Sequence, residues 1–214
     1  MGHNTLTIVD LDIGNLQSVA NAFHRVGATV SIARTPDAAE SAEILVLPGV
    51  GAFERAMNRL NEQRLGPVVR RHALERRRPL IGICLGMQLL ADCSYEHGRF
   101  EGLGIIGGEV VQLESQPPVY RVPNIGWTAV KAAKPSPMFP LEVDGQSFYH
   151  VHSYHLVCKD PKDVAATYEF GGYPIVTAIE RENVFGMQFH PEKSQDAGLN
   201  LLHSLLLHIK SAGP

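Results

Sequence analysis

One cysteine stands between two glycines where a predicted strand meets a predicted helix. Cys84 follows the apolar run Pro79 to Ile83, which predicts a short buried strand, and Gly82 and Gly86 flank it. Glycine permits a tight turn, and the amides that open the next helix direct their positive end toward the sulfur. The pattern is a cysteine version of the nucleophile elbow, although a lone cysteine after a strand is more often part of the core. Cys84 is therefore a candidate nucleophile.

A candidate base and a candidate acid lie together near the end of the chain. His190 follows the alternating run Val184 to Phe189, and Glu192 comes after Pro191. One Glu192 oxygen can accept from the imidazole while the other ring nitrogen remains available. A thiol needs such a base and an orienting acid to react at neutral pH. Taken alone, the two residues would be a strand-end histidine and a surface acid; combined with Cys84 they predict a triad.

A glycine-rich turn offers hydrogen-bond donors for an oxyanion. Pro48 to Phe53 places Gly49 and Gly51 on either side of Val50, between a predicted strand and a predicted helix. Such a backbone can approach a substrate closely and direct an amide toward it. We expect the amides of Val50 and Leu85 to bind a tetrahedral oxyanion. A phosphate-binding loop is the alternative, but no Gly-Lys-Ser/Thr follows, and the run is too short for a dinucleotide fingerprint.

Strands and helices must alternate to place these residues together. Apolar runs and helical spacing in the first half predict strands at 5–11, 29–33, 44–47 and 79–83, and helices at 15–26, 52–78 (interrupted near Gly66) and 85–93. The second half predicts hairpin-like strands at 109–113, 147–158, 164–170, 175–181 and 184–189, and a closing helix at 196–210. We expect an α/β fold, with a central mostly parallel sheet flanked by helices and additional antiparallel strands, in a single domain spanning 1–214. Parallel sheets bind ligands at the carboxyl ends of their strands, which puts Gly14, Gly49 and Cys84 on one rim.

Composition narrows the class of protein. The chain has 214 residues, of which 44% are hydrophobic and 19% charged, and its formal charge of -3 gives no reason to expect a nucleic-acid partner. Three cysteines without CxxC spacing argue against a zinc site or a disulfide framework, and for a reducing compartment. Met1 to Asn4 lacks the features of a signal peptide, and no apolar stretch reaches about 18 residues. We expect a cytoplasmic location, no membrane association, no metal and no cofactor.

These motifs together resemble those of class I glutamine amidotransferases, which release ammonia from glutamine with a Cys-His-Glu triad. Further segments are similar to one branch of that family, the glutaminase subunits of imidazole glycerol phosphate synthases. They are Asp10 to Ser18, Pro48 to Phe53, Pro123 to Trp127, Phe148 to Tyr154, and His190 to Ser194. The resemblance extends from about Thr5 to Leu207.

The resemblance implies a role for each matching residue. It makes Cys84 the nucleophile, His190 the base and Glu192 the orienting acid. The positions that would hold glutamine are Gly51, Gln88, Glu96, Ser153 and Tyr154. The positions that would face a partner are Trp127, Tyr149 and Lys193. That partner is a separate cyclase subunit, which forms a heterodimer with the glutaminase and uses its ammonia to make imidazole glycerol phosphate and an aminoimidazole carboxamide ribotide in histidine biosynthesis. No motif for a phosphorylated substrate occurs in this chain, so the second reaction requires the partner.

Two residues depart from the family pattern. Asp12 stands where a glycine is usual, so it must adopt a positive φ or the loop must change. His150 stands beside Tyr149 where an aromatic residue is common, a change that could alter the partner contact without touching the triad.

Two other functions are compatible with parts of the pattern. One is a cysteine peptidase or another amidotransferase of the same fold, such as an anthranilate synthase component; Pro123 to Trp127 and Lys193-Ser194 speak against it. The other is a binding module without catalysis, against which the intact triad speaks.

Overall fold

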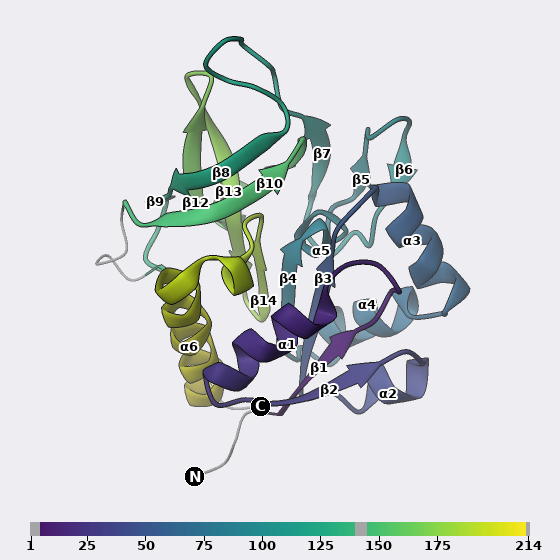
Figure 1. The fold of residues 1–214 in the computed structure, drawn as a ribbon. Helices are drawn as coiled ribbons and strands as arrows, with labels where there is room; N and C mark the ends of the chain where they lie inside the picture. Colours follow the sequence, from purple (N-terminus) through teal and green to yellow (C-terminus); the bar gives the residue numbers. More distant parts are fainter. Residues whose placement is uncertain (1–4, 140–144, 213–214) are drawn as a thin grey trace.

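An eight-stranded sheet forms the centre of the computed structural model, which describes residues 5–139 and 145–212 (Figure 1). In spatial order its strands are β2 (Thr29–Ala33), β1 (Thr5–Val9), β3 (Ile44–Gly49), β4 (Leu80–Cys84), β14 (Val184–Met187), β13 (Tyr173–Arg181), β12 (Val164–Phe170) and β9 (Lys131–Ala132). The first five are parallel, and the pairs from β14 to β9 are antiparallel. The predicted α/β class with a mostly parallel centre is confirmed. Met1 to Asn4, on which the expectation of no signal peptide rests, lie outside the described residues.

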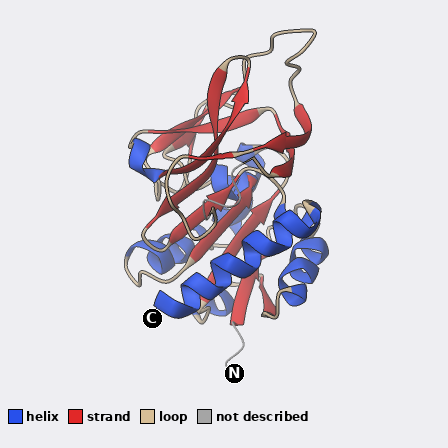
Figure 2. Ribbon diagram, turned by 90° about the vertical axis from the view of Figure 1, so that its left-hand side faces the viewer, coloured by secondary structure: helices blue, strands red, loops and turns tan. Residues whose placement is uncertain are grey.

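Helices cover both faces of this sheet. One face carries α1 (Leu16–Arg25) and α6 (Gln195–Ala212); the other carries α2 (Pro36–Glu40), α3 (Phe53–Glu62), α4 (Gly66–Leu74) and the short α5 (Leu85–Gln88). Successive side chains of a strand point to opposite faces, so in β3 Val46 packs with Phe23 of α1, whereas Leu45 and Leu47 pack with Phe53 of α3. Figure 2 shows the long α6 running along its face of the strands.

Two smaller sheets stand over the end of the large sheet where β4 and β14 finish (Figure 1). One pairs β8 (Asn124–Ala129) with β10 (Ser147–His152) in antiparallel register. The other contains β11 (Tyr154–Cys158), β7 (Gly108–Gln112), β5 (Cys93–Ser94) and β6 (Phe100–Glu101). Both therefore lie beside the predicted catalytic residues.

The predicted helix at 85–93 is wrong beyond its first turn. It ends at Gln88, and Cys93 lies in β5. The carbonyls of Leu89 and Leu90 accept from Leu103 and Ile105, which belong to a later loop, instead of from a continuing helix. Hydrogen bonds to a distant segment thus replaced the helical ones.

Other predicted elements differ in extent. The single strand predicted at 147–158 is divided at Ser153, because β10 and β11 pair in different sheets. The helix predicted at 52–78 is two helices, separated as expected just before Gly66, and the second ends at Leu74. The short helix α2 and the strand β8 were not predicted.

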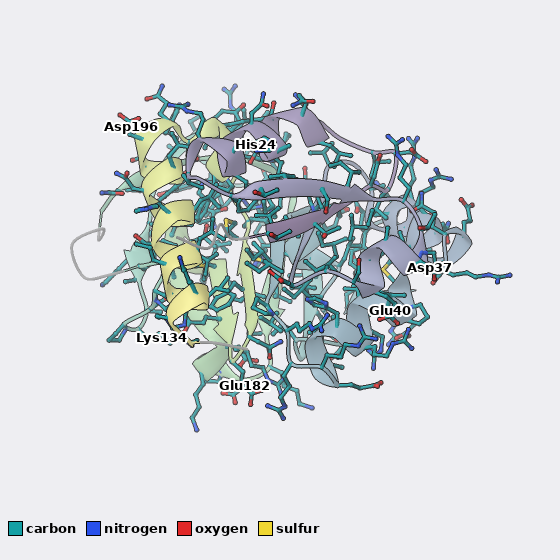
Figure 3. The ribbon with its side chains drawn as sticks, turned by 90° about the horizontal axis from the view of Figure 1, so that it is seen from below. His24, Asp37, Glu40, Lys134, Glu182 and Asp196 are labelled. Carbon is teal, nitrogen blue, oxygen red and sulfur yellow. The ribbon has the colours of Figure 1, made fainter. Side chains whose placement is uncertain are left out.

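Carboxylates neutralise arginines at the end of the sheet opposite Cys84. Glu40, at the end of α2, pairs with Arg71 and Arg76, while Glu182, in the turn before β14, pairs with Arg77. Figure 3 looks onto this end and shows both glutamates. Partly exposed pairs of this kind contribute little to stability. Two of the arginines, Arg76 and Arg77, belong to the basic run that follows α4. No helix within residues 5–139 and 145–212 is long and apolar enough to cross a membrane.

Candidate active site

Cys84 occupies a sharp turn between β4 and α5. Its backbone has φ 53° and ψ -112°, and α5 begins at the next residue. The turn depends on glycine: a Cβ on Gly86 would overlap the carbonyl oxygen of Leu47, and a Cβ on Gly82 would lie 2.8 Å from the Met87 Cα. A positive φ at a residue other than glycine costs about 1–3 kcal/mol, so the surrounding packing holds the sulfur in an otherwise unfavourable position. This is the turn that the glycines predict.

His190 and Glu192 form a buried pair beside this turn. The imidazole Nδ1 lies 2.8 Å from Glu192 Oε1, and their side chains are 3% and 5% exposed. The other ring nitrogen, Nε2, is buried next to Cys84 without a hydrogen bond of standard geometry, so it is free to take the thiol proton. Burial lowers the pKa of His190, but the neighbouring Cys84 sulfur and the Glu192 carboxylate outweigh it and raise that pKa to about 9.

The backbone of β10 fixes His190 in place. The His190 amide donates to the Tyr149 carbonyl at 2.9 Å, and the Tyr149 amide donates to Ser194 Oγ at 3.0 Å. The fully buried Ser194 hydroxyl in turn donates to the His190 carbonyl at 2.6 Å. The position of the imidazole is therefore tied to the strand that carries Tyr149.

The glycine loop lies directly beside Cys84. Gly49 is its Cα partner across the β3–β4 ladder, which brings Val50 next to the elbow. Gly51 has φ 109°, whereas Gly49 does not have a positive φ. The loop between β1 and α1, called the first loop here, packs on Val50, since a Cβ on Gly14 would lie 3.2 Å from Val50 Cγ2. A hollow at this point is lined by residues of both loops and of the triad, among them Gly14, Gly49, Val50, His190 and Glu192.

The five residues predicted to hold glutamine lie on separate segments around the elbow. Gln88 is buried, and its Nε2 donates to the Tyr154 carbonyl at 2.8 Å and to Gln188 Oε1 at 2.9 Å. Both amide hydrogens are used, so Oε1 is the atom that Gln88 can offer to a ligand. Glu96 Oε2 accepts from the Phe53 amide at 2.7 Å, which ties Glu96 to the start of α3 and to the glycine loop.

Gly51 and Ser153 complete the predicted set. Gly51 is exposed in the glycine loop, on the same side as Glu96. Ser153 lies between β10 and β11, and its carbonyl accepts from the Leu113 amide at 2.8 Å. Hydrogen bonds therefore join the predicted residues in two groups, Gln88 with Tyr154 and Glu96 with the glycine loop.

Sequence reasoning missed one residue of the site, Gln188. This side chain is fully buried and lies between Gln88 and the Cys84 sulfur. A signal was present, because Gln188 precedes His190 by two residues and alternate residues of an extended chain point to the same side.

Trp127 and Tyr149 of the small β8–β10 sheet form one cluster with Lys193, which lies in the turn after His190. Trp127 and Tyr149 are directly opposite each other in the ladder, with ring centroids 6.2 Å apart. Lys193 Nζ lies 5.9 Å from the centroid of the Tyr149 ring. Trp127 is 49% exposed and Ile125, two residues before it on the same face, is 61% exposed. The three predicted partner-facing residues thus share one accessible surface.

The two departures from the family pattern have different outcomes. Asp12 adopts φ 55°, donates its amide to Asp10 Oδ1 at 2.9 Å and pairs with Arg59, so the first loop keeps a positive φ without glycine. The His150 side chain is fully buried, so it is not itself exposed to a partner. Its ring bonds to the Phe148 carbonyl and to a threonine hydroxyl of β13.

A comparison with protein families identifies the family of the chain. The model of class I glutamine amidotransferases matches residues 7–208. The chain belongs to the class I glutamine amidotransferase family.

Among the residues that the structure describes, no group of three or more His, Cys, Asp or Glu could hold a metal ion.

Curated relatives cover nearly the whole chain. The imidazole glycerol phosphate synthase subunit HisH of Salinibacter ruber is 43% identical over 92% of this chain and 91% of its own length. The proteins of the same name from Aquifex aeolicus and Thermosynechococcus vestitus are 44% and 41% identical, over 92% and 98% of this chain and 93% and 100% of their own lengths.

Solved structures of lower identity share the fold. PurLQS from Thermotoga maritima superposes with a TM-score of 0.73 at 18% identity, covering 97% of this chain and 99% of that one. A glutamine amidotransferase from the same organism gives 0.63 at 16% identity, with 99% of this chain and 86% of that one covered. At this identity the likeness supports the fold class alone.

The elbow generates a stability prediction. Replacing Gly86 with alanine should lower the free energy of unfolding by about 2–4 kcal/mol, because the new Cβ forces α5 away from the end of β3. Gly66→Ala is the matched control: its Cβ would have ordinary contacts of 3.7 Å or more, so stability should change by less than about 0.5 kcal/mol. Urea denaturation of both variants measures the difference, and equal stabilities would contradict the assigned crowding.

Proposed function

We propose that this chain hydrolyses glutamine to glutamate and ammonia, with Cys84 as the nucleophile. The observation that carries the proposal is the buried His190–Glu192 pair beside a strained cysteine, with an imidazole nitrogen left free. Membership in the amidotransferase family supports glutamine as the substrate, and the curated relatives support the glutaminase branch over a peptidase.

The reaction proceeds in two stages. His190 Nε2 takes the thiol proton, and the Cys84 sulfur attacks the carboxamide carbon of glutamine, while the amides of Val50 and Leu85 stabilise the oxyanion. When the tetrahedral intermediate collapses, the C–N bond breaks and His190 gives the proton to the departing nitrogen. Ammonia is released, and a glutamyl thioester remains on Cys84. Water, deprotonated by the same imidazole, then attacks the thioester carbon. The C–S bond breaks to release glutamate, and His190 returns the proton to the Cys84 sulfur. Glu192 orients the ring and balances its positive charge.

The surrounding residues hold the amino-acid end of the substrate. Gln88 Oε1 accepts from the ammonium group of glutamine, and the Glu96 carboxylate provides an anionic contact near the glycine loop. Gly51, Ser153 and Tyr154 complete the site with backbone groups and the tyrosine ring.

The ammonia is used by a separate cyclase subunit in a heterodimer, which forms imidazole glycerol phosphate and an aminoimidazole carboxamide ribotide in histidine biosynthesis. The names of relatives at 43% and 44% identity support this assignment. The cyclase would bind the exposed cluster of Trp127, Tyr149 and Lys193. We place the reaction in the cytoplasm and treat residues 1–214 as a single amidotransferase domain, without cofactor or metal, nucleic acid or membrane.

Replacing Cys84 with alanine should abolish synthesis that depends on glutamine and leave synthesis from added ammonium salt by the same complex nearly intact. The thiol serves only the release of ammonia. Cyclase product formation with each nitrogen source measures the difference. Loss of both activities in a normally assembled complex would refute the division of labour between the subunits.

Variants of the buried pair should differ in severity. His190→Ala should be nearly as damaging as loss of Cys84, because members of a triad act as a unit. Glu192→Gln should retain part of the glutaminase rate, since an amide can still orient the imidazole but does not balance its charge. Glutamate release by the assembled complexes is the measurement, and equal, complete loss in both folded variants would show that Glu192 does more than assist.

The isolated chain should be a poor glutaminase that the ligand-bound cyclase activates. Rotation of the Gly49–Val50 peptide would exchange the Val50 amide for a carbonyl that repels the oxyanion, and loss of one oxyanion donor lowers the rate roughly a hundred- to a thousand-fold. A partner drives this rotation only if it binds the active arrangement more tightly.

Trp127→Ala should weaken association or activation, because exposed aromatic residues commonly anchor interfaces.

Glutamate release is compared for the isolated chain, the complex, and the complex with the cyclase's nucleotide ligand. Comparable rates in all three would exclude the activation, and unchanged assembly and activation in Trp127→Ala would exclude this surface as the anchor.

A further inference from the structure

A carboxamide that has no role in the reaction described above touches the nucleophile. Gln188 Nε2 lies 3.7 Å from Cys84 Sγ, within hydrogen-bonding range for sulfur. The Gln188 side chain is fully buried, and its backbone amide donates to the Thr177 carbonyl at 2.8 Å. Its position is therefore set by the large sheet and does not depend on solvent.

The direction of this hydrogen bond follows from a backbone carbonyl. The Tyr154 carbonyl can only accept, so the Gln88 atom 2.8 Å from it must be Nε2. The same Gln88 nitrogen donates its second hydrogen to Gln188, and the Gln188 atom 2.9 Å away must then be Oε1. The remaining Gln188 atom, which faces the sulfur, is consequently the amide nitrogen.

The reversed arrangement is unfavourable at every step. Turning Gln188 over would oppose two NH₂ groups at the Gln88 contact, and turning Gln88 as well would oppose its oxygen to the Tyr154 carbonyl. Buried polar groups left without partners cost about 1–3 kcal/mol each. The orientation of both amides is thus determined by the contacts themselves.

The Tyr154 carbonyl, which accepts from Gln88, also accepts a hydrogen bond from His152. His152 Nδ1 lies 2.8 Å from the Tyr154 oxygen and must donate to it, which leaves Nε2 to accept from the Tyr168 hydroxyl at 3.0 Å. Tyr168 in turn accepts from Asn124 Nδ2 at 3.2 Å. Burial lowers the pKa of His152 to about 3, so the ring remains neutral and the direction of the hydrogen bonds does not reverse near neutral pH.

We propose that Gln188 is a further catalytic residue, whose Nε2–H donates to the Cys84 sulfur and stabilises the thiolate, with its direction fixed through Gln88 by the Tyr154 carbonyl. The inference rests on the proposed role of Cys84 as nucleophile. When His190 Nε2 takes the thiol proton, the charge left on the sulfur faces this N–H. The contact weakens in the neutral thioester and returns when water cleaves the C–S bond, so Gln188 favours both the attacking and the leaving thiolate.

The test measures the thiolate directly. The full chain is treated with iodoacetamide over a range of pH, and modification of Cys84 is followed by peptide mass spectrometry. Burial raises the pKa of the Cys93 and Cys158 thiols, the latter to about 12, so these two cysteines react slowly and serve as internal references.

Two variants at one position separate the donor from the packing. Gln188→Met keeps the volume but removes the N–H, and the pH midpoint of Cys84 alkylation should rise by about one unit, within the range of a hydrogen bond to a charged group. Gln188→Glu keeps an acceptor for Gln88 but places a carboxylate against the sulfur, and should raise the midpoint further. If the Met variant does not fold, the nearly isosteric Glu variant decides the outcome.

Thr177→Val is the matched control. This substitution removes a buried hydroxyl that bonds to His150 Nε2 at 2.7 Å. It keeps the Thr177 carbonyl that accepts from the Gln188 backbone amide, and it keeps Gln188 Nε2, the donor to the Cys84 sulfur. Its midpoint should equal that of the unmodified protein.

Equal midpoints in the unmodified protein and both Gln188 variants would overturn the assignment, as would an equal rise in Thr177→Val. Alkylation requires no turnover, so these results leave the glutaminase proposal standing. That proposal fails instead if the unmodified complex releases no glutamate from glutamine.

Discussion

The close approach of α5 to the end of β3 is the constraint on which the site depends. Only a residue without a side chain fits at Gly86, against the Leu47 carbonyl. The absence of a side chain allows α5 to begin directly after β4. Cys84 then takes a backbone conformation that most residues avoid. Because β4 lies between β3 and β14 in the middle of the sheet, the surrounding packing stabilises this conformation and the sulfur projects at the rim.

Two segments that are far apart in the sequence meet at the Cys84 sulfur. The glycine loop follows β3, the imidazole follows β14, and both strands are neighbours of β4. Parallel order places their carboxyl ends at one edge. The Cys84 side chain therefore has an oxyanion loop on one side and a base on the other, although Val50 and His190 are far apart in the sequence.

The surface proposed to face the partner and the His190 imidazole are connected through the backbone of Tyr149. Tyr149 is part of the exposed cluster through its ring, while its carbonyl and amide bond to His190 and Ser194. A protein that binds this ring contacts a strand whose main chain holds the base. These hydrogen bonds connect the exposed ring and the candidate base through a single residue.

Much of the fold could be predicted from local patterns, and the failures have a common cause. The four parallel strands of the first half, the break before Gly66 and the closing helix follow from apolar periodicity and from glycine or proline at the ends. The helix at 85–93 failed because Leu89 and Leu90 bond to a loop that follows later. Strand β8 was not recognised because Asn124 and Gly126 have low strand propensity, and the strand exists through its ladder with β10.

The sequence by itself identified the candidate nucleophile, base and acid, since Cys84, His190 and Glu192 each stand in a short segment whose glycine, proline and apolar neighbours imply the local conformation. Tertiary structure alone decided which way the buried amides point. Gln88 and Gln188 are a hundred residues apart, and the direction of their hydrogen bonds depends on the Tyr154 carbonyl, which belongs to strand β11. A carboxamide can donate or accept at either end, so its role is defined by its partners in space, which no local pattern contains.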